Sequence, residues 1–485
     1  MSVRKHLGIA GLVLAGTGFA VLLSWPKASG VFSRQVPRIS SQRAANVSPF
    51  GRGSLLDEVA PKTRGSPNAD LSGPVPTTRQ LEQQLRLINE NQQQVNELKL
   101  RSAAAMQAKN GELVKAIVEQ GKQSISLLNL RLSALQVDLE SARRARPDDP
   151  TVQWLTGELL LIAGGEPDEI RPYYERALAA GLKQPQLFAS LAKVAFDSNH
   201  FQAAYDYAQK ALQGDRHSQP VWEMYARTSF GIERFSEVVR VLDRAFPQMK
   251  PPWAVEMRST AQHLLEEWRR ELALRQTEKE RGNLPMVRFT IEHRGFVNGA
   301  ANPMQDNNQS AGEKSTGRGV VEIELFEDQA PLAVANFVNL VEHGFYDGTR
   351  FHWAEAGRMV VGGDPNTKGE NRARDGMGGP GYSIPDESNS ALARGHFRGS
   401  ISMVQRGPTA GSQFLITLVP CPEFNGHFTV FGRVVAGQEV IDEVTQGRTN
   451  REVGEFGKII PGDLLVHAEV IRKRPHQYEV TRVSP

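Results

Sequence analysis

The spacing of apolar residues predicts long helices in the first half of the chain. Over residues 78–146, apolar positions recur every three or four residues, which is the helical period. The most regular set alternates steps of four and three: Val114, Val118, Gly121, Ile125, Leu128, Leu132, Leu135 and Leu139. Such a seam is typical of a coiled coil, so we expect it either to form a homodimer through residues 114–139 or to pack against the next domain.

Residues 147–250 contain an internal repeat with a period of 34 residues. One column of the repeat is aromatic and another is alanine: Trp154, Phe188 and Trp222, and then Ala177, Ala211 and Ala245. A small residue lets two helices approach closely, and a large aromatic residue fills the space between neighbouring pairs. The pattern resembles three tetratricopeptide repeats, which predicts a helical solenoid that binds protein partners.

The residues after the repeats predict one more helix, over residues 251–284, which would cap the solenoid. Its far end is charged. Its predicted apolar face holds Met257, Ala261, Leu264, Trp268 and Leu272.

From residue 285 onward the apolar period changes from the helical value to two, which predicts strands. Val287, Phe289 and Ile291 form such an alternating run, and residues 320–326 predict the returning strand. A helix is expected from Pro331, and a second short helix over residues 438–444. The predicted fold is therefore multidomain, with an all-α coiled-coil and solenoid region followed by a closed antiparallel β-barrel with two helices.

The N-terminal segment predicts a membrane anchor. Residues 7–24 carry no charge and follow Arg4 and Lys5. As a helix they would extend about 27 Å, enough to cross the hydrocarbon core. We favour an uncleaved single-pass anchor, with the bulk of the chain on the non-cytoplasmic side, in the periplasm or its equivalent. The alternative is a cleaved signal peptide and a secreted protein.

The changes of pattern give a domain plan. Residues 27–78 are rich in Pro, Gly, Ser and Arg, which predicts a disordered basic linker. The predicted segments are an anchor or signal peptide (1–26), the linker (27–78), a helical segment (79–146), three repeats (147–250), a capping helix (251–284), a barrel (285–475) and a tail (476–485).

Composition limits the chemistry. The net charge is only +3, so nothing global indicates a nucleic-acid partner. Cys421 is the one cysteine, which excludes an intramolecular disulfide. The histidines show no spacing typical of metal ligands, so we expect neither a metal site nor a cofactor.

Several short motifs follow one another in the last third of the chain. They are Phe351-His352, Gly362-Gly363-Asp364, Gly411-Ser412-Gln413-Phe414 and Val430-Phe431-Gly432. As a set they resemble the signature of cyclophilins, the β-barrel peptidyl-prolyl cis-trans isomerases, over roughly residues 285–475. The resemblance implies that proline-containing polypeptide segments are the substrates.

The resemblance assigns roles residue by residue. Gln413 stands at the position of the family's substrate-binding glutamine and Met359 at that of its pocket methionine. Trp353 stands where the family has the arginine that acts on the prolyl amide. Arg358 lies five residues further on, at an apolar pocket position, and could turn its guanidinium into the vacated space.

The remaining implied positions bind substrate. Leu415 and Phe424 replace a pocket phenylalanine and a pocket leucine. Val404 and Gln405 hold the positions that pair with the substrate backbone, and Trp353 would cover the pocket.

Two functions follow from this set. Isomerisation requires an apolar grip on the proline ring and a donor that favours the twisted amide over the planar one. An indole donates one hydrogen bond but carries no charge. The chain is therefore either an isomerase that assists the folding of exported or envelope proteins, or a weak or inactive scaffold that binds proline peptides and protein partners through its barrel and repeats.

Overall fold

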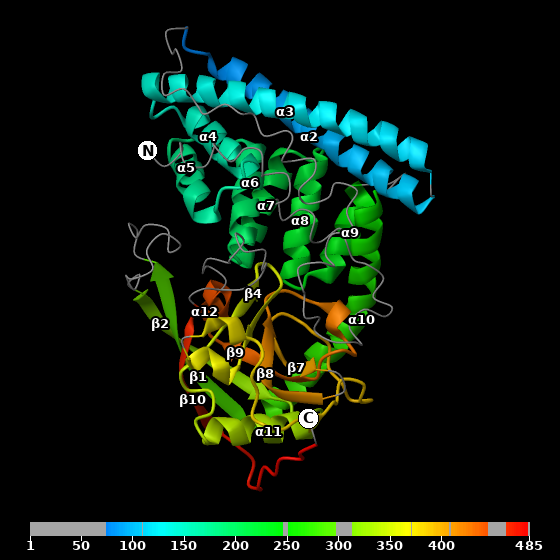
Figure 1. The fold of residues 1–485 in the computed structure, drawn as a ribbon, viewed down its shortest axis with the longest axis vertical. Helices are drawn as coiled ribbons and strands as arrows, with labels where there is room; N and C mark the ends of the chain where they lie inside the picture. Colours follow the sequence, from blue (N-terminus) through cyan, green and yellow to red (C-terminus); the bar gives the residue numbers. More distant parts are fainter. Residues whose placement is uncertain are drawn as a thin grey trace. The chain divides into compact units, whose positions relative to one another are not determined.

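The computed structural model describes residues 74–108, 110–245, 251–296, 313–369, 371–406, 409–444 and 462–483 (Figure 1). The predicted membrane anchor and nearly all of the basic linker lie outside these residues. Among the helices that are described, none is both long enough and apolar enough to cross a membrane. The described chain forms two compact units, one ending at Val194 and the other beginning at Ala195.

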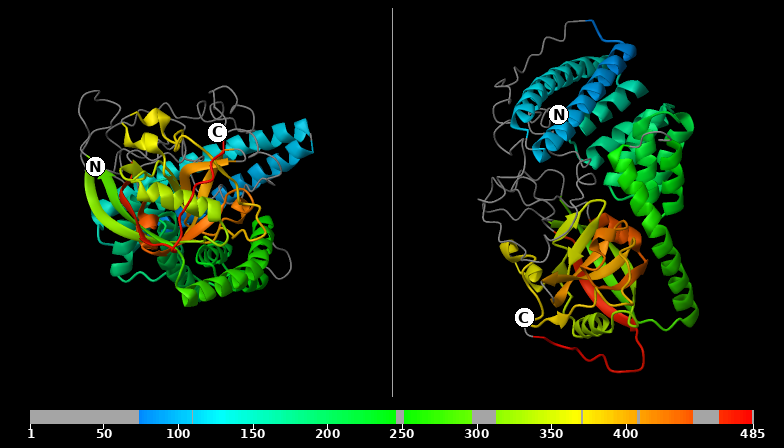
Figure 2. Two further views of the ribbon diagram at one scale, coloured as in Figure 1. Left: turned by 90° about the horizontal axis from the view of Figure 1, so that it is seen from below. Right: turned by 90° about the vertical axis from the view of Figure 1, so that its right-hand side faces the viewer.

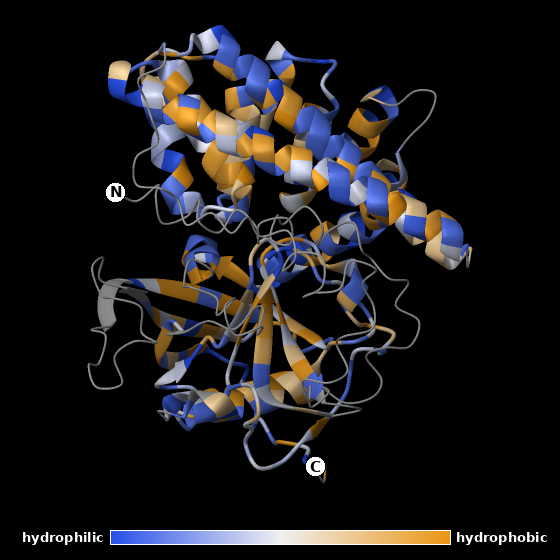
Figure 3. Cartoon of the chain, turned by 45° about the horizontal axis from the view of Figure 1, so that its top comes forward, coloured by the Kyte–Doolittle hydropathy of each residue, from blue (hydrophilic) through white to orange (hydrophobic). Residues whose placement is uncertain are grey.

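The first unit begins with two long helices, α2 (Thr78–Gln107) and α3 (Gly111–Ala145), that pack along each other. Figure 3 shows hydrophilic and hydrophobic residues alternating along both. The buried residues of α3 are Ile117, Gly121, Ser124, Leu128, Leu135, Leu139 and Ala142. Of the predicted seam, Gly121, Leu128, Leu135 and Leu139 are therefore confirmed as buried, and Leu132 is half-buried. Ile117 and Ser124 are buried in place of Val118 and Ile125. Because α3 packs against α2 in the same chain, a homodimer through residues 114–139 stays a prediction.

Paired helices follow at the spacing of the sequence repeat. They are α4 (Pro150–Ile162), α5 (Pro167–Ala179), α6 (Pro185–Asp197), α7 (Phe201–Gly214), α8 (Gln219–Gly231) and α9 (Phe235–Ala245). The alanine column behaves as predicted in the first two pairs, where Ala177 and Ala211 are fully buried. Gly157 of α4 lies against Tyr174 of α5, since a Cβ at this glycine would be 2.4 Å from the ring. The region is thus repeat-like, and a tetratricopeptide solenoid stays a prediction.

Helix α10 (Pro252–Arg281) differs from the predicted cap in what it buries. Ala261 and Leu264 are buried as expected, but Leu272 is 47% exposed, so its place on the packed face was wrong. The reason is that α10 continues along the barrel (Figure 2) and turns Glu271 and Glu278 inward. Both carboxylates bind Arg394 of the barrel, whose side chain is 2% exposed.

The C-terminal domain is one antiparallel sheet with two helices. Its strands are β1 (Met286–Phe296), β2 (Glu313–Leu325), β3 (Thr349–Arg350), β4 (Trp353–Glu355), β5 (Met359–Gly362), β6 (Ile384–Pro385), β7 (Ser400–Arg406), β8 (Thr409–Thr417), β9 (Val430–Ala436) and β10 (Leu464–Arg472). The helices are α11 (Pro331–Glu342) and α12 (Gln438–Glu443), and short 3-10 turns include η4 (Pro365–Lys368), η5 (Arg372–Arg374) and η6 (Pro422–Phe424).

The prediction of a closed barrel is wrong, because the sheet curls but its first and last strands do not pair with each other among the described residues. The strand order is β3-β10-β1-β2-β9-β7-β8-β5-β4, and β6 pairs with β8. The end strands β3 and β4 are thus left unpaired with each other in the described part of the chain. Arg350 of β3 pairs with Leu464 of β10 and makes an isolated bridge to Asp364. Both strands are very short, and Phe351 and His352 between them bond elsewhere, to Asp463 and Val361.

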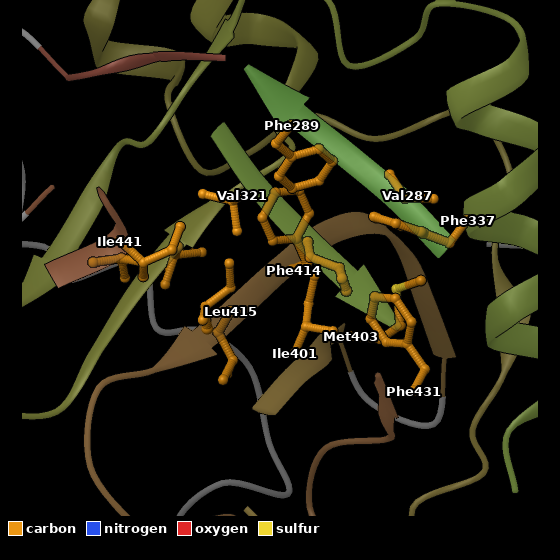
Figure 4. Close-up of a cluster of buried hydrophobic side chains, with 14 of the residues drawn as sticks. Val287, Phe289, Val321, Phe337, Ile401, Met403, Phe414, Leu415, Phe431 and Ile441 are labelled. Atoms are coloured by element: carbon orange, nitrogen blue, oxygen red, sulfur yellow. The ribbon is translucent and has the colours of Figure 1, made fainter. Parts of the chain in front are cut away.

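The core lies inside the curled sheet (Figure 4). Val287, Phe289 and Ile291 of β1 are fully buried, as their alternation predicts. The rings of Phe289 and Phe414 are 5.7 Å apart between centroids. This interior is the rigid support for the outer face of β4, β5 and β8, where the site residues lie.

Candidate functional site

Three adjacent strands align an apolar row on one face of the sheet. Trp353 on β4 pairs with Val361 on β5, Val361 pairs with Leu415 on β8, and Leu415 pairs with Ser402 on β7. Residues paired in this way share a face of an antiparallel sheet. Leu415 and Val361 are 2% and 8% exposed, and Trp353 is half-buried against the same cluster. The register therefore aligns a continuous apolar row from residues 8 and 54 positions apart in the sequence, with Trp353 as its most exposed member.

The next row begins at the turn between β4 and β5. Glu355 pairs with Met359, and Met359 pairs with Thr417, so Met359 lies on the face that carries the apolar row. Arg358 extends from the turn into two ion pairs, 3.0 Å from Glu355 and 3.1 Å from Glu423. Its guanidinium also lies 4.9 Å from the ring centroid of Phe424.

These contacts fix the charge states around Arg358. Burial works against the guanidinium, but Glu355 and Glu423 outweigh it and raise the pKa of Arg358 above its usual value. Burial raises the pKa of Glu423, and Arg358 opposes that rise. Arg358 is therefore a fixed cation held between two carboxylates.

Phe424 belongs to a group of rings beside Arg358. It packs edge-on against Phe428 at 5.3 Å and against His396 at 5.6 Å. Burial lowers the pKa of His396 to about 4, so this imidazole is neutral at physiological pH. Its Nδ1 lies 2.9 Å from Oδ1 of Asn425. His396 therefore packs against Phe424 as a neutral, buried ring and adds no charge to the site.

The polar residues of the site are already bonded within the chain. Gln413, which is 6% exposed, donates from Nε2 to the carbonyl oxygen of Gly378 at 2.8 Å. Gln405 donates to Asp386, and Val404 beside it packs against the apolar cluster. A peptide that binds Gln413 through the same amide group has to compete with the Gly378 carbonyl.

The carboxylates near this face are structural. Asp364 caps η4 by accepting from the backbone N–H of Asn366 at 2.8 Å. Glu387 accepts from the N–H groups of Leu332 and Ala333 at the start of α11. The Cys421 thiol is 1% exposed, and burial raises its pKa well above the usual value, which makes it a poor nucleophile.

The structure brings most of the predicted residues together. Trp353, Met359, Leu415, Phe424 and Val404 all belong to or pack against one apolar cluster. Gln413 lies two residues from Leu415 on the same strand, hence on the same face.

Sequence reasoning missed the two carboxylates that hold Arg358. Glu355 is three residues before Arg358, a spacing that could have suggested a pair across a short turn. Glu423 is 65 residues away, and only the fold brings it near.

Comparison with known proteins agrees with this geometry. Residues 313–461 match the family described as cyclophilin type peptidyl-prolyl cis-trans isomerase/CLD. A peptidyl-prolyl cis-trans isomerase of Helicobacter pylori is 42% identical over 135 residues, which are 27% of this chain and 78% of that protein. One of Arabidopsis thaliana is 36% identical over 154 residues, 32% of this chain and 93% of that protein.

Two further proteins are similar to the same part of the chain. Peptidyl-prolyl cis-trans isomerase B of Bacillus subtilis is 40% identical over 134 residues, 27% of this chain and 88% of that protein. The crystal structure of a cyclophilin type isomerase of Cryptosporidium parvum is 25% identical, covers 39% of this chain and 99% of its own, and has a TM-score of 0.29. Through its C-terminal domain, the chain belongs to the family of cyclophilin-type peptidyl-prolyl cis-trans isomerases.

Proposed function

We propose that the barrel isomerises Xaa-Pro bonds in polypeptides, and that the chain assists the folding of exported or envelope proteins. One observation carries the proposal: Trp353, Val361 and Leu415 form an apolar row, with Met359 on the same face, in a domain of the isomerase family. The proline ring would bind on this surface. The helix pairs would recruit protein partners, and residues 7–24 would anchor the chain with its bulk on the non-cytoplasmic side.

The chemistry required is modest. Partial double-bond character holds the amide planar, with a barrier of about 20 kcal/mol. The site must hold the ring on apolar side chains and stabilise the twisted amide, in which the proline nitrogen becomes basic. The indole N–H of Trp353 is the donor at the family's arginine position, and the carboxamide of Gln413 lies on the same face.

We do not assign Arg358 as the charged donor to the prolyl amide, although its positive charge suggests that role. To reach the amide, its guanidinium would have to leave Glu355, Glu423 and the ring of Phe424. We therefore assign it to the wall of the site. Without a charged donor the rate should fall by about 10²–10³ relative to a site with one.

A second function is a module that binds proline peptides without turnover. Two observations favour it: the guanidinium of Arg358 is held in ion pairs, and the amide of Gln413 is already bonded to Gly378. In this alternative the barrel and the helix pairs form a scaffold.

Exchange NMR on a short Ala-Pro peptide separates the two functions. For an isomerase, the full chain broadens the cis and trans resonances, and Gln413→Ala abolishes the broadening. Gln262→Ala is the matched control, since Gln262 is exposed on α10. Shifts of the peptide resonances without exchange would instead establish the binding module.

A further inference from the structure

The turns between the paired helices contain residues in an unfavourable backbone conformation. Asn199, between α6 and α7, has φ 60°, and Glu233, between α8 and α9, has φ 66°. Residues with a Cβ rarely adopt this left-handed region, and Gly164 occupies it between α4 and α5, with φ 73°. Asn199 and Glu233 are 34 residues apart, which is the period of the repeat. Asparagine tolerates this region better than most residues, and such a conformation persists where the surrounding contacts hold it.

Both side chains bind backbone N–H groups of the barrel. Oδ1 of Asn199 accepts from the N–H of Gly357 at 2.8 Å, and Oε1 of Glu233 accepts from the N–H of Arg398 at 2.8 Å. Asn199 is fully buried and also donates from Nδ2 to the carbonyl oxygen of Asp442 at 3.0 Å. Successive helix pairs thus use the same turn position to hold two different loops of the barrel.

Gly357 is the centre of the turn between β4 and β5. Its φ of 70° is left-handed, and a Cβ there would lie 3.3 Å from the ring of Phe196. One residue further along the turn, the carbonyl oxygen of Arg358 accepts from the N–H of Leu418 at 2.8 Å. The turn is therefore held at two points, and Asn199 supplies the contact from the helical side.

We propose that Asn199 is a positioning residue of the isomerase site, because it fixes the turn that presents Arg358 and Met359. The inference rests on the proposed function, since the ligand is the proline peptide named there. Without the Asn199 acceptor, the N–H of Gly357 loses its partner and the turn can rotate. Rotation would move Met359 on the apolar face and disturb the contacts of Arg358 with Glu423.

Three variants separate positioning from general stability. Asn199→Gly keeps the left-handed turn and removes the side-chain bonds to Gly357 and Asp442. Asn199→Asp keeps an acceptor for Gly357, but it loses the amide donor to Asp442 and adds a buried carboxyl group, so its stability is measured beside its affinity. Glu233→Gly is the matched control, because it makes the same change one repeat later, at the N–H of Arg398 and not in the turn that carries Arg358 and Met359.

The measurements use the full chain with a short Ala-Pro peptide. NMR titration gives the dissociation constant, exchange NMR gives the isomerisation rate, and the amide resonance of Gly357 reports its hydrogen bond. Asn199→Gly should shift that resonance and weaken peptide binding about five- to tenfold, the equivalent of one hydrogen bond. Asn199→Asp should restore most of the affinity, and Glu233→Gly should lower the unfolding midpoint without changing the affinity.

The outcomes also distinguish the two proposals. Peptide affinity without exchange in the wild type would overturn the isomerase function alone, and the affinity measurements would still test Asn199. Unchanged affinity in Asn199→Gly, or equal losses in Asn199→Gly and Glu233→Gly, would overturn the positioning role. A wild-type chain with no affinity for the peptide would overturn both.

Discussion

Replacing Trp353 by arginine should raise the isomerisation rate. The change puts a charged donor on the face that already carries Val361, Leu415 and Met359. One preorganised donor contributes about 10²–10³ in rate, or about 2.7–4 kcal/mol of transition-state stabilisation. Glu355 lies two residues along β4 on the same face and would compete for the new guanidinium. We therefore expect a gain of about tenfold or more in kcat/KM, below the full value.

The substitution also has a cost in stability. Trp353 is half-buried and packs against the apolar cluster, so losing the indole should lower the free energy of unfolding by about 1–3 kcal/mol. Urea unfolding of both chains measures this loss. The rates are then compared at a temperature where both remain folded, so that a change in rate is not a change in the folded fraction.

Exchange NMR on the Ala-Pro peptide is the assay, and Trp353→Met is the control. Methionine removes the indole and keeps the position apolar, so it tests whether uncovering the surface is enough. The reasoning is refuted if Trp353→Arg binds peptide with unchanged affinity and shows no gain in rate. It is refuted equally if Trp353→Met gains as much as Trp353→Arg, because charge would then be irrelevant.

Two further predictions concern the interior of the second unit. Arg394→Ala removes the cation that the buried Glu271 and Glu278 share, leaves Glu271 its pair with Arg275, and should cost up to about 3–5 kcal/mol at pH 7. Arg288→Ala, at an exposed pair, should leave the unfolding midpoint nearly unchanged. In the native chain, burial acts to raise the pKa of Glu271, but Arg394 lowers it below the usual value. The stabilisation from this ion pair is therefore present above the pKa of Glu271 in the unfolded chain. It is lost as the pH falls through the pKa of Glu271 in the folded chain. In Arg394→Ala the pKa of Glu271 should rise, and that of Glu278, which burial already raises, should rise further, so the deficit in urea unfolding should shrink from pH 7 to pH 5; a pH-independent deficit would contradict this. Gly357→Ala forces a Cβ into left-handed backbone against Phe196 and should cost about 1–2 kcal/mol in the same assay, and an unchanged midpoint would show that the turn is free to move.

The spacing of apolar residues predicted helices and strands well where one face of the element is buried and the other is exposed to solvent. Val287, Phe289 and Ile291 alternate because β1 has such faces, and the helix starting at Pro331 is where its sequence places it. The seam of α3 was partly wrong because Ser124, a polar residue, occupies a buried position. Apolar spacing cannot find a buried serine.

Because apolar spacing does not detect buried polar residues, it also missed the buried carboxylates of α10 and the polar contacts of the site. Glu271 and Glu278 look like residues of a solvent-facing helix end, and only the fold shows that Arg394 neutralises them. Motifs identified Trp353 and its neighbours because they lie close together in the sequence. They could not find Asn199, whose bond to Gly357 joins residues 158 positions apart.

These long-range contacts make the helical elements of the second unit part of the barrel's own packing. Phe201 of α7 is 1% exposed and belongs to the barrel's core cluster, and the guanidinium of Arg398 lies 4.7 Å from its ring centroid. Burial raises the pKa of Glu233, which binds the Arg398 backbone, to about 7. Since the charged form of a buried carboxylate is the costly one, the contribution of Glu233 to stability falls as pH rises through this value. The helices thus support the loops beside the isomerase face through buried polar groups, so a change in the helices reaches the site through Asn199 without any contact with the peptide.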